Sequence, residues 1–204
     1  PFVGTDGYGN VYPGAQIPFG GIQISPDTDS RFYDAASGYK YNHLTLMGFS
    51  LTHLSGTGIP DLGDFLFIPG TGEMKLEPGT HEDPDQGYRS RYSHDKEWAS
   101  PNYYAVELAD YGVKAEMTSG VRSGMFRFTY PESDNAFIMI DMNHTLWQSC
   151  EWSNLRMIND STITGYKLVK GWGPERHVYF TATFSKKLTG LRFVQDKKPV
   201  IYNT

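Results

Sequence analysis

The sequence has very little cysteine: Cys150 is alone among 204 residues, which excludes an internal disulfide and a cysteine-based zinc site. It has no apolar run of membrane-spanning length and no run of Lys and Arg that could follow a phosphate backbone. We therefore expect neither a membrane span nor a nucleic-acid partner. Phosphate-binding loops, HExxH zinc motifs and GxSxG nucleophile motifs are also absent. The chain begins at Pro1 without a signal peptide, a start that processing or truncation explains.

Aromatic side chains, in contrast, make up 15% of the residues, and 22 Gly and 12 Pro accompany them. Aromatic rings pack well on a pleated, half-buried surface, and Gly and Pro supply turns. No segment shows the period of an amphipathic helix of three turns or more. The composition therefore predicts an all-β domain. Aromatic rings on a mildly acidic chain, with a net charge of −5, suit sugars as ligands, although an aromatic core explains most of the rings equally well.

Alternation of apolar and polar residues predicts many short strands at intervals of roughly ten residues. The predicted strands cover residues 20–25, 44–55, 64–69, 102–110, 113–119, 124–130, 136–142, 162–170, 177–185 and 190–194. Segment 136–142 is apolar on both faces and is expected in the centre of a sheet. The polar segment 77–101 is expected to run over the surface. This pattern predicts two packed antiparallel sheets or a barrel.

The densest group of functional side chains lies in residues 48–64, GFSLTHLSGTGIPDLGD. Its two glycines let the backbone approach a partner closely, and its polar side chains suit sugar hydroxyls. The residues concerned are His53, Gly56, Thr57, Gly58 and Asp61. A tight connection between two strands, with its acids bonded to backbone N–H groups, explains the same residues without a ligand. The spacing alone favours this second interpretation.

Metal ligands are not evident in the sequence. Asp27, Asp29 and Asp34 are spaced loosely like a calcium loop, but the glycine and the terminal glutamate of an EF-hand are missing. We expect these three acids to be solvated turn residues. One histidine, His53, does not make a metal site, and the sequence predicts no metal ligand in this chain.

Four longer segments resemble successive blocks of glycoside hydrolase family 92, and they occur in the order of that family across nearly the whole chain. They are PFVGTDGYGNVYPGAQIPFGGIQISPDT, GYKYNHLTLMGFSLTHLSGTGIPDLGDFLFIPGTG, YSHDKEWASPNYYAVELADYGVKAEMT and ITGYKLVKGWGPERHVYFTATFSK. Several blocks in one order are far more specific than any single motif.

The resemblance implies an exo-acting, inverting α-mannosidase that removes terminal mannose, such as α-1,2-linked mannose, from glycans. Residues 1–204 would form its N-terminal domain, a two-sheet β-sandwich of the galactose-mutarotase-like supersandwich type, open to further strands at its C-terminal end. A catalytic (α/α)6 barrel would follow in the same chain and contribute the general acid, the general base and most ligands of a Ca²⁺ ion. The family is largely bacterial and its members are often exported, so the resemblance implies export to the periplasm or cell surface.

The segment around His53 resembles the loop of the family that faces the active-site cleft. The resemblance implies that the sugar site is lined by His53, Ser55, Gly56, Thr57, Ile59 and Asp61. The sequence departs from the family pattern at Leu51, Tyr8 and Asn10, where histidine is frequent in relatives. These departures leave the linkage specificity open.

Inverting hydrolysis needs two carboxyl groups about 6.5–9.5 Å apart. Nothing in the sequence singles out such a pair, so we expect no catalytic residue in this chain and no activity from residues 1–204 alone. Two other hypotheses remain open. One is a non-catalytic carbohydrate-binding β-sandwich module, whose sugar platform would use exposed tryptophans, and the other is a structural sandwich without a ligand. The candidate platform residues are Trp98, Trp147, Trp152 and Trp172.

Overall fold

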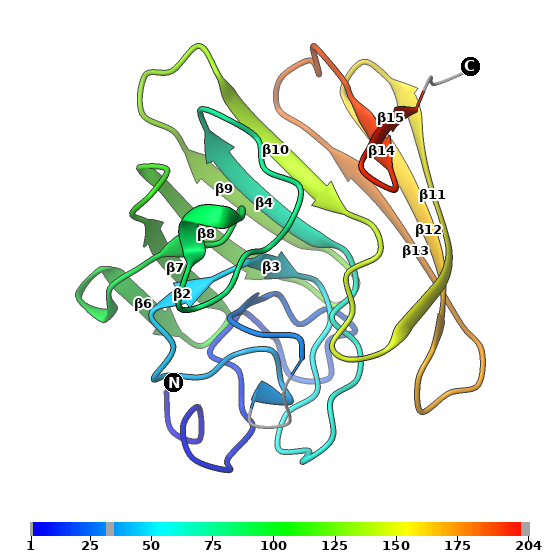
Figure 1. The fold of residues 1–204 in the computed structure, drawn as a ribbon. Helices are drawn as coiled ribbons and strands as arrows, with labels where there is room; N and C mark the ends of the chain where they lie inside the picture. Colours follow the sequence, from blue (N-terminus) through cyan, green and yellow to red (C-terminus); the bar gives the residue numbers. More distant parts are fainter. Residues whose placement is uncertain (1, 32–34, 201–204) are drawn as a thin grey trace.

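The structure, a computed structural model, describes residues 2–31 and 35–200 and consists almost entirely of antiparallel strands (Figure 1). One four-stranded sheet contains, in spatial order, β1 (Ser25–Asp27), β3 (Gly48–Ser50), β4 (Leu66–Thr71) and β10 (Ala136–Asp141). The other contains β6 (Glu97–Ser100), β7 (Tyr103–Leu108), β8 (Val113–Ser119) and β9 (Gly124–Thr129). They form the predicted two-sheet β-sandwich, which is confirmed.

A third sheet stands to the right of the sandwich in Figure 1 and contains β11 (Ser149–Asn159), β12 (Thr162–Lys170) and β13 (Arg176–Thr183). The smaller elements are the pair β2 (Thr45–Leu46) and β5 (Ser90–Arg91), the hairpin β14 (Phe193–Gln195) and β15 (Lys198–Val200), and the 3-10 turns η2 (Pro84–Gln86) and η3 (His94–Lys96). Within the described residues, we find no helix with the length and apolar character that crossing a membrane would require.

The two four-stranded sheets face each other across an apolar core. The ring of Phe49 on β3 lies with its centroid 6.5 Å from Phe126 and 6.3 Å from Phe128 on β9. Phe67 on β4 lies 5.1 Å from Phe126. The alternation predicted for residues 113–119 is confirmed, because Val113, Ala115 and Met117 all join this core. The sheets are thus held together mainly by burial of apolar surface, the dominant favourable force in folding.

The three-stranded sheet packs against the edge of this core through β13. Phe180 lies 4.5 Å from Phe65 and 6.0 Å from Phe67, measured between ring centroids. Alternate residues of β13 are partly buried and exposed, so the sheet turns one face to the sandwich and the other to solvent.

The strand predicted over residues 44–55 is wrong in its second half. Only Thr45–Leu46 and Gly48–Ser50 are strands, and an irregular loop follows up to Phe65. Leu51 donates to Asp64 and Gly63 donates to Thr52 through their backbones, so the two ends of this loop approach each other. Regular pairing stops there because Leu62, Gly63 and Phe65 have positive φ angles, which a strand cannot accommodate.

The central position predicted for segment 136–142 is also wrong. β10 is an edge strand that pairs with β4, and most of its residues are only partly buried. An apolar strand indicates that both of its faces find contacts, but it does not indicate how many neighbouring strands it has. Met139 packs against the cluster of buried residues on one face of β4, and Phe137 contacts the ring of Tyr111.

The polar segment 77–101 is more than the expected surface excursion. Tyr88, Arg89, Tyr92 and Glu97 are all buried within it. The carboxylate of Glu97 accepts hydrogen bonds from Tyr39 at 2.9 Å and from Tyr104 at 2.6 Å. Polar residues can be buried in this way when each finds partners, and composition alone does not show such partners.

The strand β11 was not predicted from the sequence. Its register against β12 shifts between Cys150 and Trp152 and again between Met157 and Asn159. Each shift inserts an extra residue into one strand, so the alternation of apolar and polar residues changes phase along β11. A search for unbroken alternation therefore misses it.

Candidate functional site

The loop between β3 and β4 carries all six residues predicted to line a sugar site. We call residues 55–59 the loop tip and the flanking residues 51–54 and 60–65 the loop base. Ser55, Gly56 and Ile59 are exposed and Thr57 is partly exposed, whereas His53 and Asp61 are buried in the base. The structure therefore brings the six residues into one loop, with four at the surface and two beneath it. That they contact a sugar stays a prediction.

The loop tip is open and its conformation depends on glycine. Gly56 has a φ of +75°, and both Gly56 and Gly58 have free space where a Cβ atom would stand. The backbone N–H of Gly56 donates to the carbonyl of Asn10 at 2.7 Å, and Thr57 Oγ1 donates to the carbonyl of Ile59 at 3.1 Å. The tip thus leaves backbone and small side chains accessible to a ligand.

His53 is fixed inside the molecule by partners on both ring nitrogens. Its Nδ1 lies 2.7 Å from the carbonyl oxygen of Gln23, and its Nε2 lies 2.8 Å from Asp27 Oδ1. The other carboxylate oxygen of Asp27 lies 2.7 Å from His144 Nε2. In this arrangement, His53 ties the loop base to β1 and presents no free nitrogen to the surface.

The expectation that Asp27 and Asp29 are solvated is wrong, and Asp34 lies outside the described residues. Asp27 and Asp29 are both buried, and Asp29 Oδ2 lies 3.3 Å from His81 Nε2. Burial alone would raise the pKa of Asp27, but His53 and His144 hold it well below its usual range. Buried carboxylates with two facing partners remain charged, and a sequence without knowledge of the fold does not show those partners.

A second group of charges anchors the other end of the loop to the three-stranded sheet. Lys167 on β12 is fully buried, and its Nζ lies 3.0 Å from Asp64 Oδ1. Arg176 on β13 donates through Nη1 to Asp64 Oδ2 at 2.5 Å. Burial alone would raise the pKa of Asp64, but the positive charges of Lys167 and Arg176 lower it. Asp64 is therefore a charged link between the loop base and the sheet.

Asp61 links the loop to the turn between β12 and β13. The backbone N–H of Trp172 donates to Asp61 Oδ2 at 3.2 Å, and Asp61 Oδ1 accepts from the N–H of Leu62 at 2.6 Å. Gln148 Nε2 donates to the carbonyl of Pro60 at 2.8 Å. The indole of Trp172 is 59% exposed, so a large ring is available where the turn adjoins the loop base.

The loop base holds a backbone conformation that side chains usually avoid. Leu62 has a φ of +72° and Phe65 a φ of +58°. A left-handed conformation costs a non-glycine residue about 1–2 kcal/mol. Such residues persist where the surroundings fix them, often at functional sites. Here the carbonyl of Leu62 accepts from the N–H of Leu146 and the ring of Phe65 packs on Phe180, which together hold the strained segment in place.

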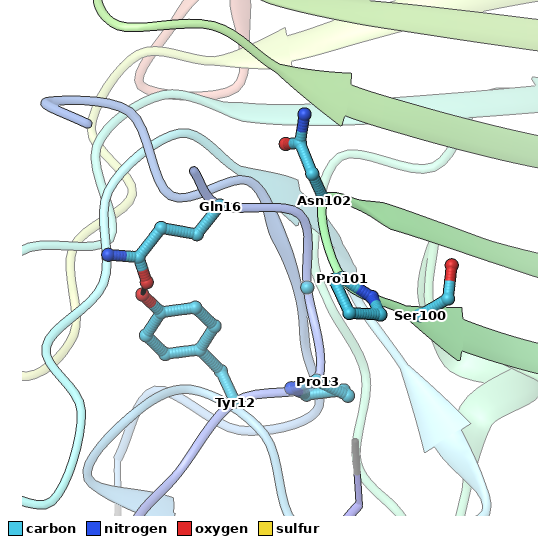
Figure 2. A pocket seen from close by; sticks show the side chains of 7 residues that line it. Tyr12, Pro13, Gln16, Ser100, Pro101 and Asn102 are labelled. Atoms are coloured by element: carbon cyan, nitrogen blue, oxygen red, sulfur yellow. Dashed lines mark hydrogen bonds between the residues drawn. The ribbon is translucent and has the colours of Figure 1, made fainter. Parts of the chain in front are cut away.

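An open hollow of about 340 Å³ lies between the N-terminal loop and the connection from β6 to β7 (Figure 2). It is lined by Tyr12, Pro13, Gly14, Gln16, Ser100, Pro101 and Asn102. Tyr12 donates a hydrogen bond from its hydroxyl to the side chain of Gln16, and burial raises the pKa of this phenol to about 12. Because no carboxylate or imidazole lines the hollow, it offers no group for acid–base chemistry near neutral pH.

The described part of the chain contains no group of three or more His, Cys, Asp or Glu side chains arranged to hold a metal ion. The acids of the candidate loop illustrate the reason. Asp61 accepts from backbone N–H groups and Asp64 is paired with Lys167 and Arg176, so neither offers the free carboxylate oxygens that Ca²⁺ binds. These two residues do not fit a calcium site.

Comparison with known proteins decides the family. The model of the glycosyl hydrolase family 92 N-terminal domain matches residues 1–204. The chain belongs to glycosyl hydrolase family 92. A solved structure of the family 92 glycosyl hydrolase ccman5 is similar, with a TM-score of 0.71 and 29% identity over 88% of this chain and 25% of that chain. A protein of Arthroderma benhamiae described as an "Uncharacterized secreted glycosidase" is 29% identical over 134 residues, 65% of this chain and 17% of the relative.

The family 92 chain described here thus spans a quarter or less of the two relatives that it matches. The resemblance inferred from the sequence is confirmed for the family and for the β-sandwich domain, whereas the hydrolase activity of the longer protein is a proposal. The finer statements, on the sugar, the stereochemistry and the division of the chain into domains, remain proposals.

Four residues that position the family 92 loop were not singled out from the sequence: Asp27, His144, Lys167 and Arg176. Asp27 was considered, but as a solvated acid. Lys167 stands at an alternate position of β12 whose neighbours on the same face are buried, and a lysine within such a face is a signal that a buried carboxylate must lie opposite. His144 and Arg176 carry no such signal, because their partners come from distant segments.

Proposed function

We propose that this chain is the substrate-site-lining domain of an exo-acting, inverting α-mannosidase that removes terminal mannose from glycans. The observation that supports the proposal is the build of the loop between β3 and β4. Its tip is exposed and rich in glycine, while its base is fixed at His53 to β1 and at Asp64 to the three-stranded sheet. A rigidly based loop with accessible backbone groups is suited to hold a sugar in one orientation.

The reaction needs an acid to protonate the leaving oxygen and a base to activate water. The two acids of the loop, Asp61 and Asp64, have hydrogen-bond or cationic partners and are not available for either role. The proposal therefore assigns both proton transfers to a helical domain in the same chain. The Ca²⁺ ion is assigned to that domain as well, and no step attributed to the present residues involves it.

The tip would act by binding. The Gly56 N–H and the Thr57 hydroxyl proton are already bonded within the protein, so the Gly56 carbonyl and the Thr57 hydroxyl oxygen would accept hydrogen bonds from sugar hydroxyls. The backbone of Ser55 offers further polar groups, and Ile59, with 45% of its surface exposed, offers an apolar contact. His53 and Asp61 would act indirectly by holding the two ends of the tip. An enzyme with this activity would be exported, as the name of the Arthroderma benhamiae relative indicates for that protein.

The experiment is a comparison of kcat/KM on α-1,2-mannobiose between the enzyme that carries this domain and its Ile59→Ala variant. Loss of an apolar contact at a sugar site costs about tenfold in kcat/KM. Leu44→Ala serves as the matched control, because Leu44 is also exposed but lies outside the loop. Equal kcat/KM for the wild type and Ile59→Ala, or an equal loss in Leu44→Ala, would contradict the proposed role of the tip. Absence of mannose release by the wild type would contradict the proposed activity.

A carbohydrate-binding role without catalysis is the second candidate. The observation that favours it is the group of exposed aromatic side chains on the outward face of the three-stranded sheet.

A further inference from the structure

We propose that the outward face of the sheet β11–β12–β13 is a glycan-binding surface, separate from the loop tip, with Trp152, Tyr166 and Tyr179 as its stacking rings. One such ring stands on each strand. The centroid of Trp152 lies 5.1 Å from that of Tyr166, which lies 4.7 Å from that of Tyr179. Because neighbouring strands are about 4.8 Å apart, the rings form a strip about 10 Å long, suited to a short stretch of linked pyranose rings.

The two outer rings are exposed although they are large, and Tyr166 between them is partly exposed. Trp152 is 54% and Tyr179 is 70% exposed, while the side chains on the other face of the same strands pack toward the sandwich. Exposed aromatic rings that gather on one face are unusual for a surface without a ligand or partner. Rigid aromatic side chains provide contact area at a low cost in conformational entropy.

The position of Trp152 depends on a bulge. Cys150 pairs with Val169 and Trp152 pairs with Leu168, so Glu151 is an extra residue in β11. If Glu151 were paired regularly instead, the strict alternation of a strand would place Trp152 on the same face as Cys150, toward the sandwich. The bulge turns the indole to the outward face. Bulges often change the direction of a side chain in this way near functional sites.

The groups beside the rings favour a sugar over an apolar protein partner. The hydroxyl of Tyr166 lies 2.7 Å from His177 Nδ1, which fixes both side chains, and the two rings are stacked at 26°. The register of the sheet places Asn154 beside Tyr166, and Thr181 is two residues from Tyr179 on β13, on the same exposed face. The carboxylate of Glu175 lies 3.1 Å from His177 Nε2 and adds an acceptor beside the rings. Hydrogen-bonding groups that border aromatic faces match a pyranose, which presents an apolar C–H face and a rim of hydroxyls.

The test is electrophoresis of the purified protein through native gels that contain increasing amounts of yeast α-mannan, a probe whose choice rests on the proposed function. The wild type is expected to be retarded. Trp152→Ala is expected to need about tenfold more mannan for the same retardation. This is the size of effect seen when a nucleic-acid base loses one aromatic stacking partner, and a sugar ring on an indole is expected to behave similarly. Tyr179→Ala is expected to weaken retardation in the same direction and provides a second reading if Trp152→Ala does not fold.

Trp98→Ala is the matched control. The sequence suggested Trp98 as a platform residue together with Trp152, but the structure places it on β6 of the sandwich, in a different sheet from the three rings, and it is 65% exposed. Its retardation should equal that of the wild type. No retardation of the wild type, or equal retardation of the wild type, Trp152→Ala and Tyr179→Ala, would overturn the proposal, and the second result is the one expected if another part of the protein covers this face. Retardation requires no turnover, so it is judged independently of mannose release, which tests the proposed function.

Discussion

The sandwich and the three-stranded sheet are held in place by different forces. Between the two four-stranded sheets the contacts are aromatic and aliphatic, as at Phe49 and Phe126. Between the sandwich and the three-stranded sheet, the two aromatic contacts of Phe180 are combined with a buried charge cluster around Asp64. Apolar packing tolerates small shifts, whereas a buried ion pair requires one geometry. Because Asp64 belongs to the base of the candidate loop, its pairing with Lys167 and Arg176 also fixes the position of the loop.

Removal of the buried cation is expected to have the largest effect on the attachment of the three-stranded sheet. Lys167→Met leaves Asp64 fully buried with Arg176 as its remaining cationic partner, and we expect the free energy of unfolding to fall by about 3 kcal/mol. Lys170→Met is the matched control, since its ion pair with Glu151 is exposed and worth about 0.5 kcal/mol. Urea unfolding followed by tryptophan fluorescence measures both. Equal losses would show that the charge cluster is not what attaches the sheet.

The aromatic part of the same attachment should contribute less. Phe180→Ala removes the ring that contacts Phe65 and Phe67, and because Phe180 is only partly buried we expect a loss of about 2 kcal/mol. Tyr179→Ala, one residue earlier and on the outward face, should change the stability little. Thermal unfolding of the two variants compares the contributions of the two faces of β13 to stability. A larger loss in Tyr179→Ala than in Phe180→Ala would contradict the packing of Phe180 on Phe65 and Phe67.

The carboxylate of Asp27, on the sandwich side of the loop, should contribute less to the free energy of unfolding, and its contribution should depend on pH. Asp27→Asn removes the carboxylate between His53 and His144, and we expect a loss of about 1.5 kcal/mol at pH 7. The pKa of Asp27 is lowered in the folded protein, so its stabilising effect is complete above the unfolded value of about 3.9 and is lost as pH falls toward the folded value.

Urea midpoints at pH 7 and pH 3 test this linkage. The difference in stability between the wild type and Asp27→Asn should be smaller at pH 3 than at pH 7. Asp95→Asn, which changes an exposed acid, is the control and should change neither midpoint much. A gap between the wild type and Asp27→Asn that widens toward pH 3 would mean that the carboxylate is not held in its charged form.

The smallest effect on stability is expected at the loop tip. Gly56 has a φ of +75°, so Gly56→Ala should cost about 1 kcal/mol, whereas Gly58→Ala has free space and no positive φ and should be nearly neutral. Differential scanning calorimetry of both variants provides the comparison. If both glycines tolerate alanine equally, the left-handed conformation is not required at the tip.

Sequence patterns predicted the sandwich because apolar and polar residues alternate without interruption along strands such as Val113–Ser119. They failed where the structure departs from alternation, at the bulged β11 and at the positive φ angles that end the strand pairing after Ser50. The six candidate site residues were found through the family resemblance. The buried partners of the loop were not, because Asp27 lies 26 residues from His53 and 117 residues from His144 along the chain. Spacing along the chain carries no information on such contacts.

We propose that this domain positions a sugar for acids that belong to another domain. The most direct measurement is release of mannose from α-1,2-mannobiose, followed by NMR of the newly released sugar, for residues 1–204 and for the enzyme that carries them. We predict no turnover by residues 1–204 and release of β-mannose, the inverted anomer, by the longer enzyme. Mannose release by residues 1–204 alone would contradict the account, since the proton-transferring groups would then lie within this chain.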